Sequence, residues 1–323
     1  MRSLKPILLT GGAGFIGSHL ARHLLQEDDL EHLIILDKLS LTGNRSNLAL
    51  PEQDPRCQFV QGDVCDSALV DKLITEHSIT GILHLAAESH VERSTIDPSD
   101  FITTNIQGTA ILLEAARKHN LSLLHCSSAG VYGSTPSPEK VKEDAPLQPT
   151  SPYAASKASA DLLCLAATNT HQVDAVITRC TTNYGPRQHL EELVPKFTQL
   201  ALRDEPIPIL GNGLHIRDWI HVDDHCEGLL AAWRRGKSGQ VYHFAGHRER
   251  THIGMARSIL NALRKPQSLI EHIADYPGHD ERHALDTEKV LMWFGWQPKR
   301  DFQEVFPEVV RALSADFESS ETV

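Results

Sequence analysis

A tyrosine and a lysine four residues apart, Tyr153 and Lys157, could carry out acid–base chemistry together. Pro152 precedes them, so the pair is expected to open a helix, and residues four apart lie on one helical face. An ammonium beside a phenol favours the phenolate and lowers the tyrosine pKa from about 10 towards neutrality. Such a tyrosine can take the proton of a hydroxyl group that is being oxidised. Ser128 ends a predicted strand, and its hydroxyl can polarise the same oxygen.

A glycine-rich stretch near the N-terminus supplies the second group of candidate residues. The stretch reads Thr10-Gly11-Gly12-Ala13-Gly14-Phe15-Ile16-Gly17 and lies between a predicted strand and a predicted helix. Gly11 permits a tight turn, Gly14 lets a pyrophosphate approach the backbone, and Gly17 lets the helix pack on the strand. The helix N-terminus at Phe15 and Ile16 then offers free N–H groups to phosphates. The stretch therefore predicts dinucleotide binding.

Asp37 decides which dinucleotide is expected. It ends the second predicted strand, twenty residues after Gly17. A carboxylate there accepts hydrogen bonds from ribose hydroxyls and repels a 2′-phosphate, which favours NAD over NADP. Lys38 and Arg45 lie nearby and are able to attract a phosphate. Further positions expected along the cofactor are Lys38, Asp63, Val64, Ala86, Ala87 and Lys157, of which Lys157 would hold the nicotinamide ribose.

These residues need a scaffold that brings strand ends together. Short apolar runs alternate with helical patterns, which predicts an α/β fold with a doubly wound parallel (Rossmann) sheet. Residues 1–185 are expected to form the NAD-binding domain, with a return strand near 175–180, and residues 186–323 mainly a smaller substrate-binding part. Strands are expected at 6–10, 32–36, 57–61, 81–86 and 122–127, and helices at 18–26, 67–77, 104–119, 224–235, 253–264 and 302–315.

Composition argues against several other classes of protein. The 323 residues carry 31 Lys and Arg against 42 Asp and Glu, a formal net charge of -11, so neither nucleic acid nor an anionic membrane is an expected partner. No apolar run is long enough to span a bilayer. The six cysteines form no Cys-x-x-Cys pair and the histidines form no ligand pattern, so we expect a cytoplasmic protein without disulfides or a metal site.

Together these residues resemble the extended short-chain dehydrogenase/reductase family, and most closely its dTDP-glucose 4,6-dehydratases. The resemblance covers nearly the whole chain. The matching stretches include residues 36–40, 86–94, 104–109, 183–188, 211–213, 217–219 and Pro277-Gly278-His279-Asp280. It implies an NAD-dependent oxidation of carbon 4 of a hexose on a nucleoside diphosphate, and a homodimer. It also implies that Ser89, Ser128, Asn183, Arg217 and Arg282 bind the substrate, with the two arginines on the diphosphate.

One stretch departs from these dehydratases. They carry Thr-Asp-Glu-Val-Tyr-Gly, whose Asp is the acid and whose Glu is the base that expel the 6-hydroxyl. This chain carries Ser128-Ala129-Gly130-Val131-Tyr132-Gly133, and Ala129 and Gly130 cannot transfer protons. Losing a positioned acid or base costs about 10²–10⁴-fold each. Glu191-Glu192 also replaces a common Glu-Lys, which removes a cation that could bind the substrate.

Three functions stay open from the sequence. The first is a nucleotide-sugar enzyme acting through a 4-keto intermediate, with 4-epimerisation as the expected net reaction, because that needs only Tyr153, Lys157, Ser128 and NAD. Epimerases of the same family carry a stretch closer to Ser-Ser-Ala-Gly-Val-Tyr-Gly. The second is a 4,6-dehydratase with relocated acid and base groups, for which Glu88 and His90 are candidates. The third is a non-catalytic NAD-binding protein, against which the intact Tyr153 and Lys157 argue.

Overall fold

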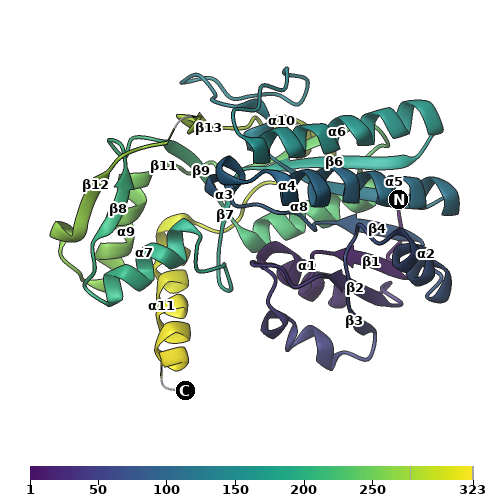
Figure 1. Cartoon of the computed structure of the whole chain (residues 1–323), viewed down its shortest axis with the longest axis horizontal. Coiled ribbons are helices and arrows are strands. Elements are labelled where there is room, and N and C mark those ends of the chain that lie inside the picture. The colour runs from purple at the N-terminus through teal and green to yellow at the C-terminus, as the bar shows by residue number, and fades with distance from the viewer. Residues whose placement is uncertain (277, 322–323) are drawn as a thin grey trace.

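A sheet of seven parallel strands runs through the larger part of the molecule (Figure 1). This computed structural model describes residues 1–276 and 278–321. The strand order is β10-β6-β5-β4-β1-β2-β3, so the order reverses beside β1. The strands are β1 (Ile7–Thr10), β2 (Leu33–Asp37), β3 (Cys57–Gln61), β4 (Gly81–His84), β5 (Ser122–Ser128), β6 (Asp174–Cys180) and β10 (Val241–Phe244).

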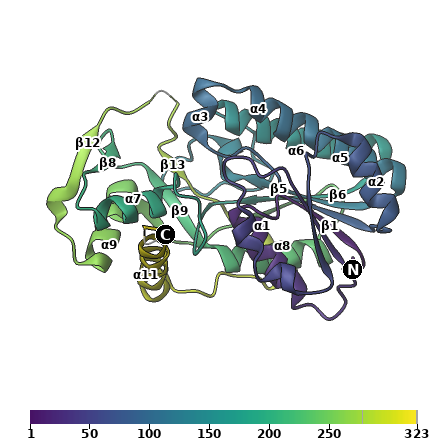
Figure 2. The ribbon, with the colours of Figure 1, turned by 60° about the horizontal axis from the view of Figure 1, so that its bottom comes forward.

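Helices cover both faces of this sheet, as Figure 2 shows. Ile7 and Leu9 of β1 pack towards α1 (Phe15–Leu25) and α8 (Val222–Arg235), whereas Leu8 packs towards the opposite layer. That opposite layer contains α2 (Ser67–Glu76), α5 (Thr109–His119) and α6 (Pro152–His171). Strands buried on both faces are apolar along their whole length, as parallel strands generally are. The expected doubly wound α/β fold is therefore confirmed.

Most element boundaries lie within a few residues of those expected, but the helix predicted at 104–119 is composite. Its first part is a π-helix over Ile102–Gly108, which becomes α5 at Thr109. Two short helices, α3 (Val91–Ile96) and α4 (Ser99–Phe101), precede the π-helix. A π-helix has wider turns than an α-helix and is frequent at functional sites. Its buried Asn105 bonds the backbone of Glu88 and the Ser156 hydroxyl, which ties it to the loop after β4 and to α6.

The division expected at residue 185 assigns too little of the chain to the sheet. β10 lies after that point yet pairs with β6, Val241 opposite Ile177, and forms the edge of the large sheet. α8 also follows residue 185 and packs against α1. The physical reason is burial: without β10 and α8, the apolar face of β6 and one side of α1 would be open to solvent.

A smaller lobe lies beside the carboxyl ends of the large sheet's strands (Figure 1). Its own core is built from apolar residues such as Phe197, Trp219 and Ile259. The elements are β7 (Thr182–Tyr184), α7 (Leu193–Leu202), β8 (Ile207–Leu210), β9 (Ile216–His221), β11 (Glu249–Thr251), α9 (His252–Leu263), β12 (Ile270–Ile273), β13 (Arg282–His283) and α11 (Phe302–Glu321), with α10 (Glu288–Phe294) returning to β10.

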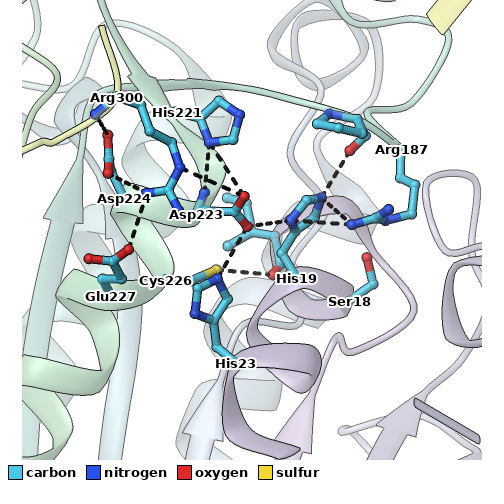
Figure 3. A network of polar contacts seen from close by, with 12 residues as sticks. Ser18, His19, His23, Arg187, His221, Asp223, Asp224, Cys226, Glu227 and Arg300 are labelled. Atoms are coloured by element: carbon cyan, nitrogen blue, oxygen red, sulfur yellow. Dashed lines mark hydrogen bonds and ion pairs between the residues drawn. The ribbon is translucent and has the colours of Figure 1, made fainter. Parts of the chain in front are cut away.

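One carboxylate, Asp223 at the start of α8, joins parts of both lobes (Figure 3). Its Oδ1 lies 2.8 Å from Nδ1 of His19 and 3.2 Å from Nε2 of His23, both on α1. His19 in turn contacts the carbonyl of Pro186 at 3.0 Å and Arg187 at 2.8 Å through Nε2. The helix that follows the glycine-rich loop is thus fastened to the segment that follows β7. None of the described helices combines the length and apolar character that a membrane span requires.

Candidate active site

A cavity of about 360 Å³ opens where the two lobes meet. Its floor is made by residues at or just past the carboxyl ends of β1, β2, β4, β5 and β6, represented by Gly11, Asp37, Ala86, Ser128 and Cys180. Residues of the smaller lobe close the other side, namely Arg217, Tyr276, His279, Asp280 and His283. Ligands of open α/β sheets bind at this edge, beside the point where the strand order reverses.

Almost every residue expected at the site lines this one cavity. The predicted residues that line it are Gly11, Gly14, Phe15, Ile16, Gly17, Asp37, Lys38, Asp63, Val64, Ala86, Ala87, Ser89, Ser128, Tyr153, Lys157, Asn183 and Arg217. Arg282 does not line it. In the resembled stretch at 277–280, Pro277 lies outside the described residues, whereas His279 and Asp280 reach the cavity.

The glycine-rich loop fits a dinucleotide pyrophosphate. Gly11 has a φ of +72°, and a Cβ there would lie 2.5 Å from the backbone nitrogen of Ala86. A Cβ on Gly17 would lie 2.1 Å from the Gly11 carbonyl oxygen, so α1 can approach the loop only without a side chain there. Gly14 is the N-cap of α1, and no side chain caps the first N–H groups. Those N–H groups and the helix dipole stay available for phosphates.

The polar side chains beyond the loop fit the adenosine half of such a ligand. Asp37 accepts hydrogen bonds from the backbone N–H of Ala13 at 2.9 Å and of Leu39 at 2.8 Å, which fixes the carboxylate at the cavity edge. Burial raises the Asp37 pKa above its ordinary value, and these two bonds oppose that rise. Lys38 is held by Thr104 at 2.8 Å and Glu88 at 3.1 Å. A ribose at Asp37 thus meets a rigid acceptor.

Tyr153 and Lys157 lie on the first turns of α6, as expected. Ser151 caps the helix by accepting from the backbone N–H of Ala154 at 3.2 Å, and Pro152 occupies the first turn. Lys157 is 3 % exposed, and among the described residues it has no hydrogen-bond or ion-pair partner. A buried ammonium without a partner is costly. Its free N–H groups fit the hydroxyls of a nicotinamide ribose.

The pKa of Tyr153 departs from the expected direction. Burial raises it above its ordinary value, and a hydrogen bond from Ser128 only partly opposes that rise. Burial also lowers the pKa of Lys157, because the charged ammonium is poorly solvated there. The expectation that Lys157 pulls the Tyr153 pKa towards neutrality is therefore not met in the protein alone, because burial has the largest effect on that pKa.

A buried ion pair holds α6 in place behind these residues. The guanidinium of Arg179 on β6 donates to Asp161 at 2.8 Å and also to the hydroxyl of Tyr132. Asp161 stands one helical turn after Lys157 and is fully buried. Removing one partner of a buried pair leaves an uncompensated charge, which is strongly destabilising. We therefore assign Arg179 and Asp161 a positioning role for Lys157.

Of the residues expected at the substrate, Arg217 and Asn183 reach the cavity. The guanidinium of Arg217 lines the cavity and donates to the carbonyl of Ile216 at 2.9 Å, and its other N–H groups have no hydrogen-bond partner among the described residues. Burial lowers the Arg217 pKa, which Asp280 opposes. Asn183 is held by the His225 Nδ1 at 3.0 Å and the Thr181 carbonyl at 3.0 Å. A diphosphate would meet a fixed amide and a free guanidinium.

Arg282 has a different role from the one expected. Its guanidinium donates to both Glu249 oxygens, at 2.7 and 2.8 Å, and to the carbonyls of Pro136 at 2.9 Å and Glu139 at 2.6 Å. These bonds use four of its five N–H groups within the protein, and the side chain does not line the cavity, so it is not placed to bind a diphosphate there. Arg282 instead fastens β13 to β11 and to the loop after β5. The sequence could not show this because Glu249 is far away along the chain.

The Ala129-Gly130 stretch follows β5 as a short 3-10 helix capped by Ser128, whose Oγ accepts from the Gly130 N–H at 3.1 Å. Neither residue brings an acid or a base to the cavity. His283 and Asp280 stand across from Gly130, 2.9 Å apart through Nε2 and Oδ2. Neither residue was predicted from the sequence as an acid–base group. The sequence shows that the two residues are three positions apart, but it does not show that the fold places them beside Gly130.

Glu192 is a second residue that the sequence could not place. It is the N-cap of α7, lines the cavity, and has its pKa raised to about 7 by burial and by Glu191. The two relocated bases considered from the sequence do not stand free in the cavity. Glu88 is paired with Lys38, and His90, which does not line the cavity, faces Glu191 at 3.7 Å.

Two groups of described side chains come close enough together to share a cation. Cys126 and Cys180 line the cavity with His225 close to both, and His215, His252 and His279 lie in the smaller lobe. The pKa of Cys126 is lowered well below its ordinary value by hydrogen bonds with Cys180 and His225, against the effect of burial. Cys126 is partly buried, packs against the core of the larger lobe and lines the cavity.

Comparisons with known proteins agree with this geometry. Residues 8–309 match the family described as GDP-mannose 4,6 dehydratase. The dTDP-glucose 4,6-dehydratase of an Actinoplanes species is 43 % identical over 310 residues, covering 94 % of this chain and 96 % of that protein. The crystal structure of DesIV, a dTDP-glucose 4,6-dehydratase from Streptomyces venezuelae with NAD bound, superposes with a TM-score of 0.93 at 40 % identity over 96 % of this chain and 97 % of that one.

Epimerases are also similar to this chain in structure, though less so in sequence. The UDP-glucose 4-epimerase of Thermotoga maritima, with UDP-glucose, superposes with a TM-score of 0.89 at 27 % identity, covering 97 % of this chain and 99 % of that one. The matched family spans most of the chain, and the cavity carries that fold's cofactor loop and Tyr-x-x-x-Lys pair. The chain belongs to the GDP-mannose 4,6 dehydratase family, within the NAD-dependent epimerases and dehydratases of nucleotide sugars.

Proposed function

We propose that this protein binds NAD and oxidises carbon 4 of a hexose carried on a nucleoside diphosphate, dTDP in the first instance. The observation that carries the proposal is that Tyr153, Ser128 and Lys157 share one cavity with the glycine-rich loop and Arg217. The loop and Asp37 would hold the cofactor, and Arg217 with Asn183 the diphosphate. The relatives at about 40 % identity are dTDP-glucose enzymes, which favours dTDP over other nucleotides.

The roles of the three central residues follow from their chemistry. Tyr153 takes the proton of the 4-hydroxyl, and Ser128 donates to the same oxygen and keeps it in place. Lys157 binds the ribose hydroxyls and supplies a positive charge close to the phenolate that forms. NAD, when bound, accepts the hydride that leaves carbon 4. Arg179 and Asp161 keep Lys157 on this side of α6.

Two net reactions are compatible with a 4-keto sugar. The simpler one is 4-epimerisation, in which the sugar turns and takes the hydride back on its other face. It is supported by Ala129 and Gly130, which supply no acid or base, and by the small side chains that they present to the cavity. The second candidate is 4,6-dehydration, supported by the His283–Asp280 pair beside Gly130 and by the dehydratase relatives.

The product identifies the reaction. Purified enzyme with NAD is incubated with dTDP- and UDP-hexoses, and the products are examined by mass spectrometry and chromatography. A product of unchanged mass and altered retention demonstrates epimerisation, and a loss of the mass of one water demonstrates dehydration. Failure of every hexose to produce even transient NADH would contradict the proposal.

We also propose that the protein acts as a homodimer through the layer formed by α3, the π-helix and α6. Three exposed large apolar residues come from these adjacent elements: Ile96, Ile102 and Leu162, which are 85 %, 54 % and 57 % exposed. Exposed apolar side chains gathered on neighbouring helices are typical of an interface. A dimer mass in light scattering, reduced to a monomer mass by Leu162→Glu, is the expected result.

A further inference from the structure

The space beside Gly130 is bordered by two chemically useful groups. A Cβ built on Gly130 would meet the Oγ of Ser128 at 3.5 Å, the Cβ of Ala154 at 3.7 Å and the Cε1 of His283 at 3.9 Å. The hydroxyl that would meet the oxygen on carbon 4 and the imidazole of His283 therefore border the same small volume. Carbon 5 is bonded to carbon 4, so carbon 5 of a sugar held by Ser128 and Tyr153 can reach this volume.

The imidazole of His283 is held in a defined orientation. Its Nε2 lies 2.9 Å from Oδ2 of Asp280, while Oδ1 of Asp280 accepts from the Thr150 hydroxyl at 2.8 Å and from the Ser134 hydroxyl at 3.4 Å. An ionised carboxylate only accepts, so the proton of the ring lies on Nε2 and the lone pair on Nδ1. Within the described part of the chain, Nδ1 has no hydrogen-bond partner, and the side chain lines the cavity.

The backbone that carries His283 is fixed as well. Arg282, the preceding residue, uses its guanidinium to bind Glu249 and the carbonyls of Pro136 and Glu139. Its own carbonyl accepts from the Thr135 N–H at 2.8 Å. A proton-transfer group is effective only if it is held within reach of its substrate. The arginine expected to bind a diphosphate thus serves to place His283.

We propose that His283, oriented by Asp280, is a catalytic residue that moves the proton of carbon 5 in the 4-keto sugar. The proposal rests on the oxidation of carbon 4 described above, because a ketone at carbon 4 makes the carbon 5 hydrogen acidic. Nδ1 takes that proton as the C5–H bond breaks and its electron pair forms the enolate. The C5=C6 bond then forms as the C6–O bond breaks, and His283 returns the proton to the departing hydroxyl. One water leaves. The hydride taken from carbon 4 would then return to carbon 6 while carbon 5 takes a proton from solvent, so no external oxidant is needed.

The surroundings of His283 keep it ready for this step. Burial lowers its pKa below the ordinary value, Arg217 and His279 add to that effect, and Asp280 opposes it. The ring is therefore neutral near neutral pH, as a base must be. Asp280 keeps its charge there, because the bonds from His283 and Thr150 hold its pKa low against the effect of burial.

Two readouts separate this proposal from the oxidation on which it rests. The substrate is dTDP-glucose, or whichever hexose of the product panel forms NADH. Transient enzyme-bound NADH in a stopped-flow absorbance experiment reports oxidation of carbon 4. Loss of water and uptake of deuterium at carbon 5 from D₂O, both measured by mass spectrometry, report the step assigned to His283.

We expect His283→Asn to form NADH close to the wild-type rate and to eliminate water about 10²–10⁴-fold more slowly. His272→Asn is the matched control, because His272 is exposed and outside the cavity, and it should behave as wild type. Water loss at the wild-type rate in His283→Asn overturns the proposal. So does wild-type enzyme that forms NADH without water loss or deuterium uptake, which leaves the oxidation intact. If no NADH forms, the oxidation fails and this proposal fails with it.

Two further variants keep the test informative if His283→Asn folds poorly. Asp280→Asn should lower kcat for elimination with little change in KM, because the amide N–H donates to Nε2 and moves the ring proton to Nδ1. Gly130→Glu in the His283→Asn background supplies a carboxylate at the same space, which the ordinary contacts at Gly130 allow. Partial recovery of water loss supports the proposal, whereas equal elimination in wild type and Asp280→Asn refutes the role of Asp280.

Discussion

At the scale of single residues, Tyr153 is the group on which oxidation of carbon 4 depends. Tyr153→Phe removes the proton acceptor and keeps the ring that contacts Phe101. We expect the rate of NADH formation to fall by about 10²–10⁴-fold. NAD affinity, measured by calorimetry, should stay within about threefold, because the loop and Asp37 are untouched. An unchanged product rate would show that Tyr153 is not the proton acceptor, whereas NAD binding without any product from the wild type would indicate the non-catalytic function.

The raised pKa of Glu192 predicts that the stability of the protein depends on pH. Burial and Glu191 raise its pKa to about 7 in the folded protein, against an unfolded value of about 4.3. An acid whose folded pKa is raised costs stability wherever it is ionised, and the cost grows from the unfolded pKa up to the folded one. Glu192→Gln should therefore raise the melting temperature near pH 8 and change it little near pH 4. An equal shift in melting temperature near pH 8 and near pH 4 would contradict the raised pKa of Glu192.

The sequence identified residues whose role depends on local spacing, and it failed for those that depend on distant partners. Local spacing within one strand, turn or helix was enough to predict the roles of the loop glycines, Asp37 and the Tyr153–Lys157 pair. Arg282, in contrast, pairs with Glu249 on another strand. His283 became a candidate base only because the fold places it beside Gly130, which is more than a hundred residues away in the sequence. The burial that raises the Tyr153 pKa is likewise a property of the packed protein.

At the scale of elements, the turn between β1 and α1 is the most constrained backbone of the cofactor site. In Gly17→Ala the new Cβ would meet the Gly11 carbonyl 2.1 Å away, which α1 can relieve only by moving off the loop. We expect a loss of about 1–3 kcal/mol in unfolding free energy in urea, together with a loss of NAD binding.

Gly14→Ala is the matched control for that change. Its Cβ would approach the Gly11 carbonyl oxygen no closer than 3.3 Å, so the fold should tolerate it. The same methyl group would stand at the N-terminus of α1, where a pyrophosphate must approach. NAD binding should therefore fall while stability stays close to wild type. Equal destabilisation by both variants would show that the contact at Gly17 has no special cost.

Strands and helices with a strong apolar pattern were predictable to within a few residues, because β1, β2 and β5 are buried along their length. The π-helix over Ile102–Gly108 was not, since its wider turns interrupt the periodicity that marks a helix. β10 was also missed. Only its pairing with β6, about sixty residues earlier in the chain, reveals its place in the large sheet.

At the scale of the whole molecule, we expect the hydrogen bonds of Asp223 to help hold the two lobes together. Burial acts to raise its pKa, yet the bonds from His19 and His23 hold that pKa well below the ordinary range. A carboxyl with a depressed folded pKa stabilises the fold above its unfolded pKa of about 3.9 and loses that contribution as the pH falls further. Asp223→Asn should therefore lower the melting temperature near pH 7, and the difference should shrink only below about pH 4.

The matched control for Asp223 is Asp301→Asn, an exposed carboxylate paired with Arg248 at 2.8 Å. Exposed pairs contribute little, so its melting temperature should differ slightly from wild type. The network of Figure 3 also contains Arg300, whose Nε lies 4.0 Å from Asp223 and whose guanidinium bonds Asp224 and Glu227. A shift for Asp223→Asn no larger than for Asp301→Asn would contradict the role of this network.

The position of β10 at the edge of the large sheet has a consequence for synthesis on the ribosome. β6 is complete once residue 180 has been made, but its neighbour β10 is made only at residues 241–244. Throughout that interval the nascent chain carries a hydrophobic strand with open backbone groups, a template for pairing with other chains. The smaller lobe is begun before the sheet can be finished. Chaperone dependence during expression, relieved once translation passes β10, follows from the order in which these two strands are made.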